Sequence, residues 1–271
     1  MTTSGMHLPA NADSGPDPSA ESERGLEGDA APVAAPDGNW RIRFYRREDR
    51  PVVRRICADT GFLGSPIDPL FEDRELFADY LTQYYTDREP ESTLVCELDG
   101  EVMGYLMGSR RRRAYAFYRL WHNAVLVTTG MWRYFFRPYN AATRKYVHWL
   151  LTKATAESPK SPAGLPHFHI NLLPKARNVA QTRALIDRFL EYLTAQGETG
   201  VYGQMVTFDS RRGTRMFERY GFRVIDKAEV TKYQHLREGQ VFLFTVVKDL
   251  TAGTRLYGND LARAAKTPEA P

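Results

Sequence analysis

The stretch HFHINLLPKARNVAQTRALIDRFLEYL, residues 167–193, decides the fold of this chain. It begins with an apolar-rich run that stops at Pro174, and this predicts a strand over 167–173. Residues 175–181 are polar and predict a loop. From Thr182 onward, apolar residues recur at the spacing of one face of an amphipathic helix; they are Ile186, Phe189, Leu190 and Leu193. The sequence therefore predicts a strand, a loop and a helix in succession.

A loop that leads into a helix is a natural anion site. The first amides of a helix have no partner within it, and the helix dipole favours negative charge at that end. Gly197 and Gly200 end the predicted helix. We therefore expect the loop before Thr182 to bind an anionic group.

The loop also carries a family resemblance. PKARNVAQT, residues 174–182, resembles the pyrophosphate loop of the GNAT N-acetyltransferases, whose pattern is Gln or Arg, two residues, Gly, one residue, then Gly or Ala. Arg177 fits the first position, and Ala180 and Thr182 stand where the family has glycines. Glycine lets a phosphate approach the backbone closely, so the two side chains predict weaker coenzyme binding.

Two further segments resemble the same family. Asp99-Gly100 joins two strand-like runs, 93–98 and 101–107, as a tight hairpin before the central strand. The run SRRGTRMFERYGF, residues 210–222, is similar to the family's motif of Asn, a short helix with a Tyr near its end, and then Gly-Phe. Ser210 stands at the Asn position and Phe217 at the Tyr position. We also predict a last hairpin from strands 230–236 and 241–247.

The resemblance implies an α/β (α+β) domain with a mixed, mainly antiparallel sheet flanked by helices. We place this domain at residues 40–250, with a helical, aromatic insertion at 110–166. Residues 1–39 carry seven acidic and one basic side chain and few large apolar ones, so we expect a disordered acidic tail. Residues 251–271 are expected to form a frayed tail.

The charge is unevenly distributed. The chain has a net charge of +4, and residues 1–39 contribute −6, so the remainder carries +4 − (−6) = +10. A basic body suits anionic ligands. The chain has only two cysteines, no secretory signal and no apolar run of the ~18 residues needed to span a bilayer. We therefore expect a cytoplasmic protein without a membrane partner.

The insertion begins with a basic run, Arg110 to Arg113, followed by many aromatic residues. Arginines beside aromatic residues are one pattern of nucleic-acid binding. We favour helices packed on the sheet, because the aromatic residues are amphipathically spaced and no basic stripe continues between them. A lid over an acceptor site is a third interpretation, because long insertions in compact domains are often functional.

The resemblance implies an acetyl-CoA-dependent N-acetyltransferase, in which an amine attacks the thioester directly. Acetyl-CoA would be the co-substrate, and an amine of unidentified structure would be the acceptor. The pantetheine arm would lie along Asn171, Leu172 and Leu173. The pyrophosphate would lie on the loop, against Arg177, Asn178, Val179, Ala180, Gln181 and Thr182. The sequence leaves the oligomeric state open and allows a homodimer.

His169 is the preferred general base, because an unperturbed imidazole titrates near ~6.5. Phe217 cannot donate a proton to the departing thiolate, so Ser210 or water is the predicted acid. Glu97 and Asp209 are weaker alternatives. His167 lies on the same strand face as His169, but no third ligand follows at a telling spacing, and we expect no metal site.

The altered loop also supports a rival interpretation. If Ala180 and Thr182 exclude the pyrophosphate and Phe217 removes the acid, the chain is a catalytically impaired binding module with the same fold. Both hypotheses depend on the same residues and differ in whether the coenzyme binds.

Overall fold

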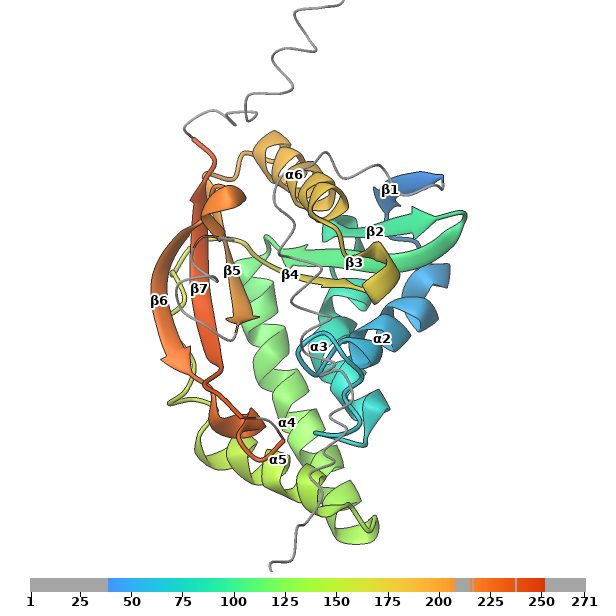
Figure 1. Ribbon diagram of the computed structural model, residues 1–271, viewed down its shortest axis with the longest axis vertical. Coiled ribbons are helices and arrows are strands. Elements are labelled where there is room, and N and C mark those ends of the chain that lie inside the picture. Colours follow the sequence, from blue (N-terminus) through green and yellow to red (C-terminus); the bar gives the residue numbers. More distant parts are fainter. Residues whose placement is uncertain (1–38, 208–214, 216, 237, 252–271) are drawn as a thin grey trace, which may run out of the picture.

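Seven strands form one sheet in the order β1-β2-β3-β4-β5-β7-β6 (Figure 1). The computed structural model describes residues 39–207, 215, 217–236 and 238–251, so Asp209, Ser210 and all but one residue of each predicted tail lie outside the described residues. The strands are β1 Trp40–Phe44, β2 Thr93–Leu98, β3 Glu101–Ser109, β4 His167–Leu172, β5 Gly200–Thr207, β6 Arg223–Glu229 and β7 Phe242–Asp249. Every neighbouring pair is antiparallel except β4 and β5. The predicted mixed, mainly antiparallel sheet is confirmed.

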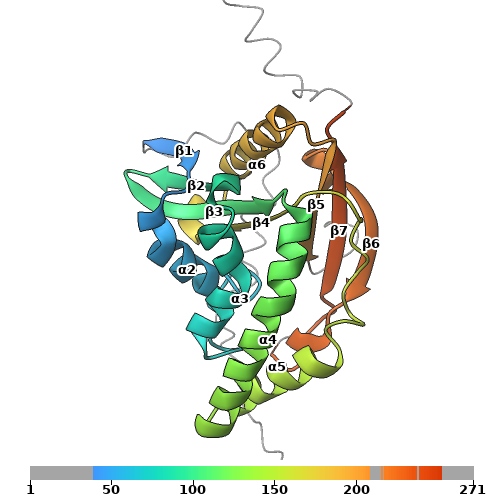
Figure 2. The same ribbon diagram turned by 180° about the vertical axis from the view of Figure 1, so that it is seen from behind.

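Helices cover both faces of this sheet (Figures 1 and 2). They are α2 Arg50–Asp59, α3 Arg74–Asp87, α4 Arg112–Phe136, α5 Ala141–Thr152 and α6 Val179–Ala195, with short 3-10 turns at Arg47–Asp49, Pro90–Ser92, Pro174–Ala176 and Thr231–Tyr233. No helix in the described ranges is long and apolar enough to cross a membrane. Two of the helices, α4 and α5, belong to the segment 110–166.

The alternation of β4 places its side chains in two different environments. Phe168 and Leu172 are buried with α6 in one apolar core. His167, His169 and Asn171 lie on the opposite face, where α2 and α3 pack on β2 and β3 in a second core. The hairpin at Asp99 and Gly100 has positive φ at both positions, 53° and 85°, as a type I′ turn requires.

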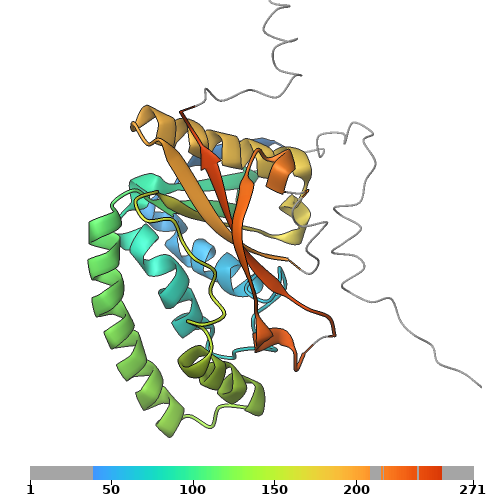
Figure 3. The same cartoon turned by 90° about the vertical axis from the view of Figure 1, so that its left-hand side faces the viewer.

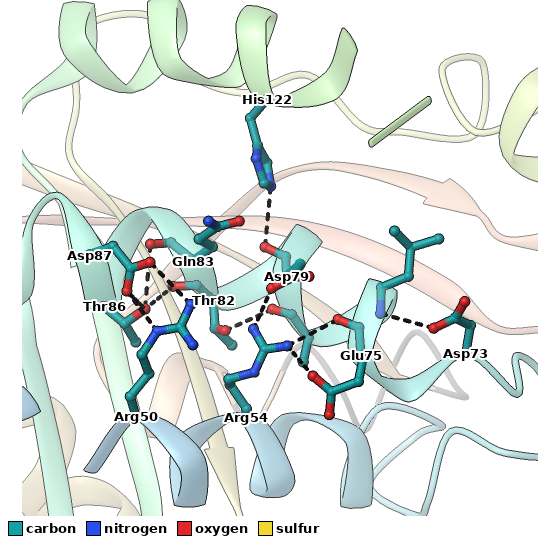
Figure 4. Close-up of polar contacts among 12 residues, drawn as sticks. Arg50, Arg54, Asp73, Glu75, Asp79, Thr82, Gln83, Thr86, Asp87 and His122 are labelled. Atoms are coloured by element: carbon teal, nitrogen blue, oxygen red, sulfur yellow. Dashed lines mark hydrogen bonds and ion pairs between the residues drawn. The ribbon is translucent and has the colours of Figure 1, made fainter. Parts of the chain in front are cut away.

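Ion pairs and one histidine join the three helices on the second face (Figure 4). Arg50 of α2 donates to Asp87 of α3 at 2.9 Å. Arg54 of α2 forms ion pairs with Glu75 and Asp79 of α3. From α4, the Nε2 atom of His122 lies 3.3 Å from the carbonyl oxygen of Asp79. The helix that begins the insertion is therefore fixed to α3.

A buried carboxylate holds the start of α4. Glu89 is fully buried, and it accepts hydrogen bonds from Tyr84 Oη at 2.9 Å, Ser92 Oγ at 3.0 Å, Ser109 Oγ at 2.7 Å, and the amides of Arg110 and Arg111 at 2.8 and 3.4 Å. These donors come from α3, the 3-10 turn at Pro90–Ser92, the end of β3 and the turn into α4. Glu89 therefore fixes where the insertion leaves the sheet.

Two predicted boundaries were wrong. The helix α6 begins at Val179 rather than Thr182, because Asn178 caps it. The predicted strand 230–236 is a 3-10 turn at 231–233, and the strand that pairs with β7 is β6. Glu157 accepts hydrogen bonds from the amide and hydroxyl of Thr231 at 2.7 and 2.6 Å, so this segment is held by the end of the insertion.

Candidate active site

The two parallel strands at the centre of the sheet separate after two residue pairs. His167 pairs with Tyr202 and Phe168 with Gly203, and no further pair joins β4 to β5. The amide of Leu173 donates to the carbonyl of Met103 at 2.9 Å. Because the main chain of alternate residues faces alternate sides of a strand, Ile170 and Leu172 direct their N–H and C=O groups away from β3, into the opening. The structure thus leaves hydrogen-bonding groups of β4 without a neighbouring strand.

The three predicted pantetheine residues lie at this opening in different ways. Leu172 faces the opening, and its carbonyl accepts a hydrogen bond from Arg177 Nε at 2.8 Å. The main chain of Asn171 faces β3, and its side chain donates to Thr60 Oγ1. Leu173 uses its amide for β3. Ile170 was not predicted, although the strand's alternation would have indicated it once the register was known.

A cavity of about 240 Å³ lies beside the opening, on the face covered by α3 and α4. Its walls are mainly aromatic and polar; they include Tyr80, Tyr84, Tyr85, Tyr115, Tyr118, Arg119, His122, Asn123, His167, His169, Tyr202 and Gln204. A second hollow of about 460 Å³ shares Tyr115, Arg119 and His167 and extends toward Pro162 and Gly164. Neither lining includes an aspartate or glutamate.

His167 belongs to a buried hydrogen-bonded chain in this wall. Its Nε2 atom lies 2.7 Å from the hydroxyl of Tyr85, which donates to the hydroxyl of Tyr115 at 3.3 Å. Burial, together with the nearby His169 and Arg119, lowers the pKa of His167 to about 3. His167 is therefore neutral at neutral pH and holds the tyrosines of α3 and α4 against β4.

His169 lies one alternate position further along β4, next to the point where the strands separate. Its ring centroid is 5.6 Å from that of Tyr85, and no hydrogen bond to its nitrogens occurs within the described part of the chain. Burial lowers the pKa of His169 to about 4, so the imidazole is neutral at neutral pH. It can accept a proton in the cavity, as a weak base.

The loop before α6 uses several of its own amides. Asn178 Oδ1 accepts from the amide of Gln181 at 2.8 Å, and the amide of Thr182 donates to the carbonyl of Asn178 at 3.0 Å. The amides of Val179 and Ala180 find no acceptor among the described residues, and both side chains are exposed. Two adjacent N–H groups at the start of α6 remain free to bind an anion.

Several solved structures are similar to this chain in fold. SsHAT is 23% identical with a TM-score of 0.52, covering 78% of this chain and 98% of that one. A GNAT superfamily phosphinothricin acetyltransferase from Sinorhizobium meliloti, in complex with AcCoA, is 16% identical with a TM-score of 0.48, covering 79% and 90%. The putative acetyltransferase yncA from Salmonella typhimurium, with its cofactor acetyl-CoA, is 14% identical with a TM-score of 0.46, covering 78% and 94%.

The protein has the GNAT fold. The sequence matches no protein-family model and no curated protein. The strand order and the separation of β4 from β5 are therefore the features that relate this chain to the fold.

Within the GNAT fold, Arg177 lies at the expected loop but is already engaged. Besides the Leu172 carbonyl, its guanidinium donates to the carbonyl of Gly64. Burial lowers its pKa. A Cβ at Gly64 would lie 2.7 Å from Arg177 Nη1, so Gly64 makes room for this side chain. Arg177 fastens the loop before α3 to the end of β4.

Two other positions considered in the sequence, Phe217 and Glu97, serve packing and ion pairing in the structure. Phe217 is buried, with its ring centroid 5.7 Å from that of Phe244, so this position offers no proton donor. Glu97 forms an ion pair with Arg43 at 2.6 Å, far along β2 from the cavity. No group of three metal-ligating side chains occurs in the ranges that the structure describes.

Proposed function

We propose that this protein transfers an acetyl group from acetyl-CoA to an amine that binds in the tyrosine-lined cavity. The observation that carries the proposal is the opening between β4 and β5. It exposes the backbone groups of Ile170 and the amide of Leu172 directly beside His169, an imidazole whose nitrogens form no hydrogen bond with the described residues.

The residues at the opening fit the coenzyme. A pantetheine arm carries amides that can pair with the backbone groups of Ile170 and the amide of Leu172 as an added strand would. Its diphosphate can accept hydrogen bonds from the free amides of Val179 and Ala180 at the positive end of the α6 dipole. The side chains of Ala180 and Thr182 limit how closely a phosphate approaches, which predicts modest affinity.

The proposed reaction requires one base to accept the proton of the attacking amine. The amine nitrogen attacks the thioester carbonyl carbon, a C–N bond forms and the C–S bond breaks. His169 accepts the proton that the nitrogen loses, and its neutral state makes it ready to do so. The sulfur leaves as a thiolate, which the ordinary thiol pKa of about 8.5 permits, and Phe217 supplies no proton at this step.

The cavity chemistry also limits the acceptor. Six tyrosines and Arg119 line the cavity, and its lining residues include no carboxylate to balance a second positive charge. Aromatic faces and a guanidinium suit an amine that carries a ring or an acidic group. Polyamines and aminoglycosides would bring several cations toward Arg119 and are disfavoured. We therefore infer a monoamine with an aromatic or anionic part.

Two observations favour the rival function. Asn178 already occupies the amide of Gln181, and Phe217 leaves no acid at its position. A binding module with an impaired coenzyme site would have the same features. The two functions differ in whether acetyl-CoA binds and reacts.

The test is release of coenzyme A thiol from acetyl-CoA by the full chain, with aromatic monoamines, amino acids and polyamines offered separately. The proposal predicts thiol release that depends on the amine and falls strongly in the His169→Gln variant. A His148→Gln variant, changed on the exposed surface of α5, should retain the activity. If no amine raises thiol release above the rate without protein, the enzyme proposal is wrong.

A further inference from the structure

The outward face of α4 is apolar where a surface helix is normally polar. Six large side chains on it are between 54% and 77% exposed; they are Phe117, Leu120, Trp121, Met131, Trp132 and Phe135. Their spacing of three, four or eleven residues puts them on one side of the helix. The opposite side holds Tyr115, Tyr118 and His122 against α3. Figure 3 shows α4 along the outer edge of the molecule.

This apolar row is long and continuous. It extends over 18 residue steps, about 27 Å along the helix, and Ala124, Val127 and Thr128 fill its middle. An exposed apolar surface of this extent in a protein indicates a surface that another molecule or a membrane covers. Nothing in the described part of the chain covers it.

Positive charge brackets the row. Arg113 is exposed one turn before Phe117 and has no ion-pair partner within the described residues. Arg137 follows the row, and its side chain is 60% exposed. It lies 3.7 Å from the buried Asp73, which Arg133 also binds, so this end keeps a net positive charge. The segment 110–156 contains ten Arg and Lys residues and no Asp or Glu. The face is therefore apolar in its centre, cationic at its ends and without any acidic residue.

We propose that the outward face of α4 docks on the surface of an anionic lipid bilayer. Helices of this kind lie in the interface, with Trp, Phe and Leu inserted and Arg or Lys contacting the headgroups. Trp121 and Trp132 have the amphipathic rings that favour the headgroup level. Arg119 and Arg133 put positive charges on the inner side of α4, so the helix is not apolar all around. It therefore lies on the bilayer and does not cross it. This inference revises our expectation from the sequence that no membrane is involved.

Charge complementarity favours lipid over a second copy of the chain. An antiparallel α4 pair would bring Arg113 of one copy near Arg137 of the other, and the segment 110–156 has no carboxylate to balance them. The acidic residues 1–39 match the charge but hold few large apolar side chains, so they do not match the row. Anionic lipid supplies both acyl chains and negative headgroups.

The test is flotation of the full chain with vesicles, followed by the fluorescence of its tryptophans. Vesicles of phosphatidylcholine with phosphatidylglycerol should bind the protein and shift the emission to shorter wavelength. Pure phosphatidylcholine or high salt should weaken binding. The variant Trp121→Gln with Trp132→Gln should bind at least about tenfold more weakly, whereas Ile225→Gln, an exposed apolar position on β6, should bind normally.

Arg113→Glu tests the charge, with the exposed Arg223→Glu on β6 as its matched control. Only the first change should reduce binding to anionic vesicles. The inference is wrong if the protein fails to bind anionic vesicles at low salt. It is also wrong if the protein is a dimer in light scattering that the two tryptophan changes dissociate, because a second copy then covers the face. Neither result depends on acetyl transfer.

Discussion

Asn178 Oδ1 accepts a hydrogen bond from the backbone amide of Gln181 at 2.8 Å, at the place where a diphosphate would bind the start of α6. The side-chain amide of Asn178 also donates to the side-chain oxygen of Gln181, so these two residues are bonded to each other at the start of the helix. The loop therefore has fewer free N–H groups than its position in the GNAT fold would allow.

We predict that Asn178→Gly strengthens binding of coenzyme A by about tenfold. The change frees the Gln181 amide for a charged acceptor, and hydrogen bonds to charged groups contribute about 1.5–3 kcal/mol. Glycine at an N-cap costs only a few tenths of a kcal/mol. Calorimetric titration of both proteins with coenzyme A measures the difference.

Asn140→Gly is the matched control. Asn140 caps α5 and accepts from the amide of Thr143 at the same distance, 2.8 Å, but it lies away from α6. It should lower stability to a similar extent and leave coenzyme binding unchanged. An equal affinity in the Asn178→Gly protein and the unaltered one would mean that this amide takes no part in binding.

His169→Gln should lower kcat by about 10²–10⁴-fold, the usual contribution of a general base. The KM for acetyl-CoA should hardly change, because the side chain lies in the acceptor cavity. Steady-state kinetics with a saturating amine measures both constants. A large rise in KM with an unaltered kcat would show that His169 binds substrate and does not accept the proton.

Stability should fall as the pH decreases from about 6.5 toward 4. Burial lowers the pKa of His167 to about 3 and that of His169 to about 4, from the ordinary 6.5. In this window the unfolded chain binds protons that the folded chain refuses, so acid favours unfolding. The stability is fully present above 6.5. Urea unfolding at several pH values measures the slope.

The double variant His167→Gln with His169→Gln should have a smaller slope between pH 6.5 and 4. Below about pH 3 both proteins should lose stability alike, because ion pairs hold the pKa of Asp49 and Asp87 below their usual value. Identical slopes in the upper window would contradict the burial of the two imidazoles.

Glu89→Gln should reduce the free energy of unfolding by about 3 kcal/mol. The amide nitrogen of Gln would face hydrogen-bond donors, since all five contacts of Glu89 are donors, and it would leave buried groups unpaired. Glu91→Gln is the control, because its pair with Arg111 is half exposed and should contribute at most about 1 kcal/mol. Equal losses in the two variants would contradict the anchoring role of Glu89.

Gly108→Ala should destabilise the protein by about 1–3 kcal/mol through overpacking. A Cβ there would lie 2.4 Å from Phe189 Cζ and 2.6 Å from the carbonyl oxygen of His167. Gly130→Ala is the control in α4, where the nearest atom is 3.6 Å away and alanine favours the helix. Thermal denaturation compares the two, and an unaltered Gly108→Ala protein would mean that β3 and β4 are less tightly packed than described.

The strand, loop and helix from His167 to Leu193 could be predicted because each depends on local chemistry. Apolar alternation, Pro174 and the helical spacing are all visible in a short window. The start of α6 was also readable: Asn178 followed three residues later by Gln181 is a capping signature. We placed the start three residues late because the apolar spacing begins only after this cap.

The cavity could not be predicted in the same way. Tyr85 and Tyr115 come from helices at the two ends of a hairpin, and they meet only because Glu89 fixes where α4 starts. Glu89 itself reads as a surface residue in a helix-breaking segment. Its burial depends on donors from three elements, which no local window contains.

The most direct measurement is calorimetric titration of the full chain with acetyl-CoA. We expect a single site with micromolar affinity, formed by the opening between β4 and β5 and the free amides of Val179 and Ala180. Absence of binding at millimolar acetyl-CoA would contradict it, and would leave a GNAT fold that has lost its co-substrate.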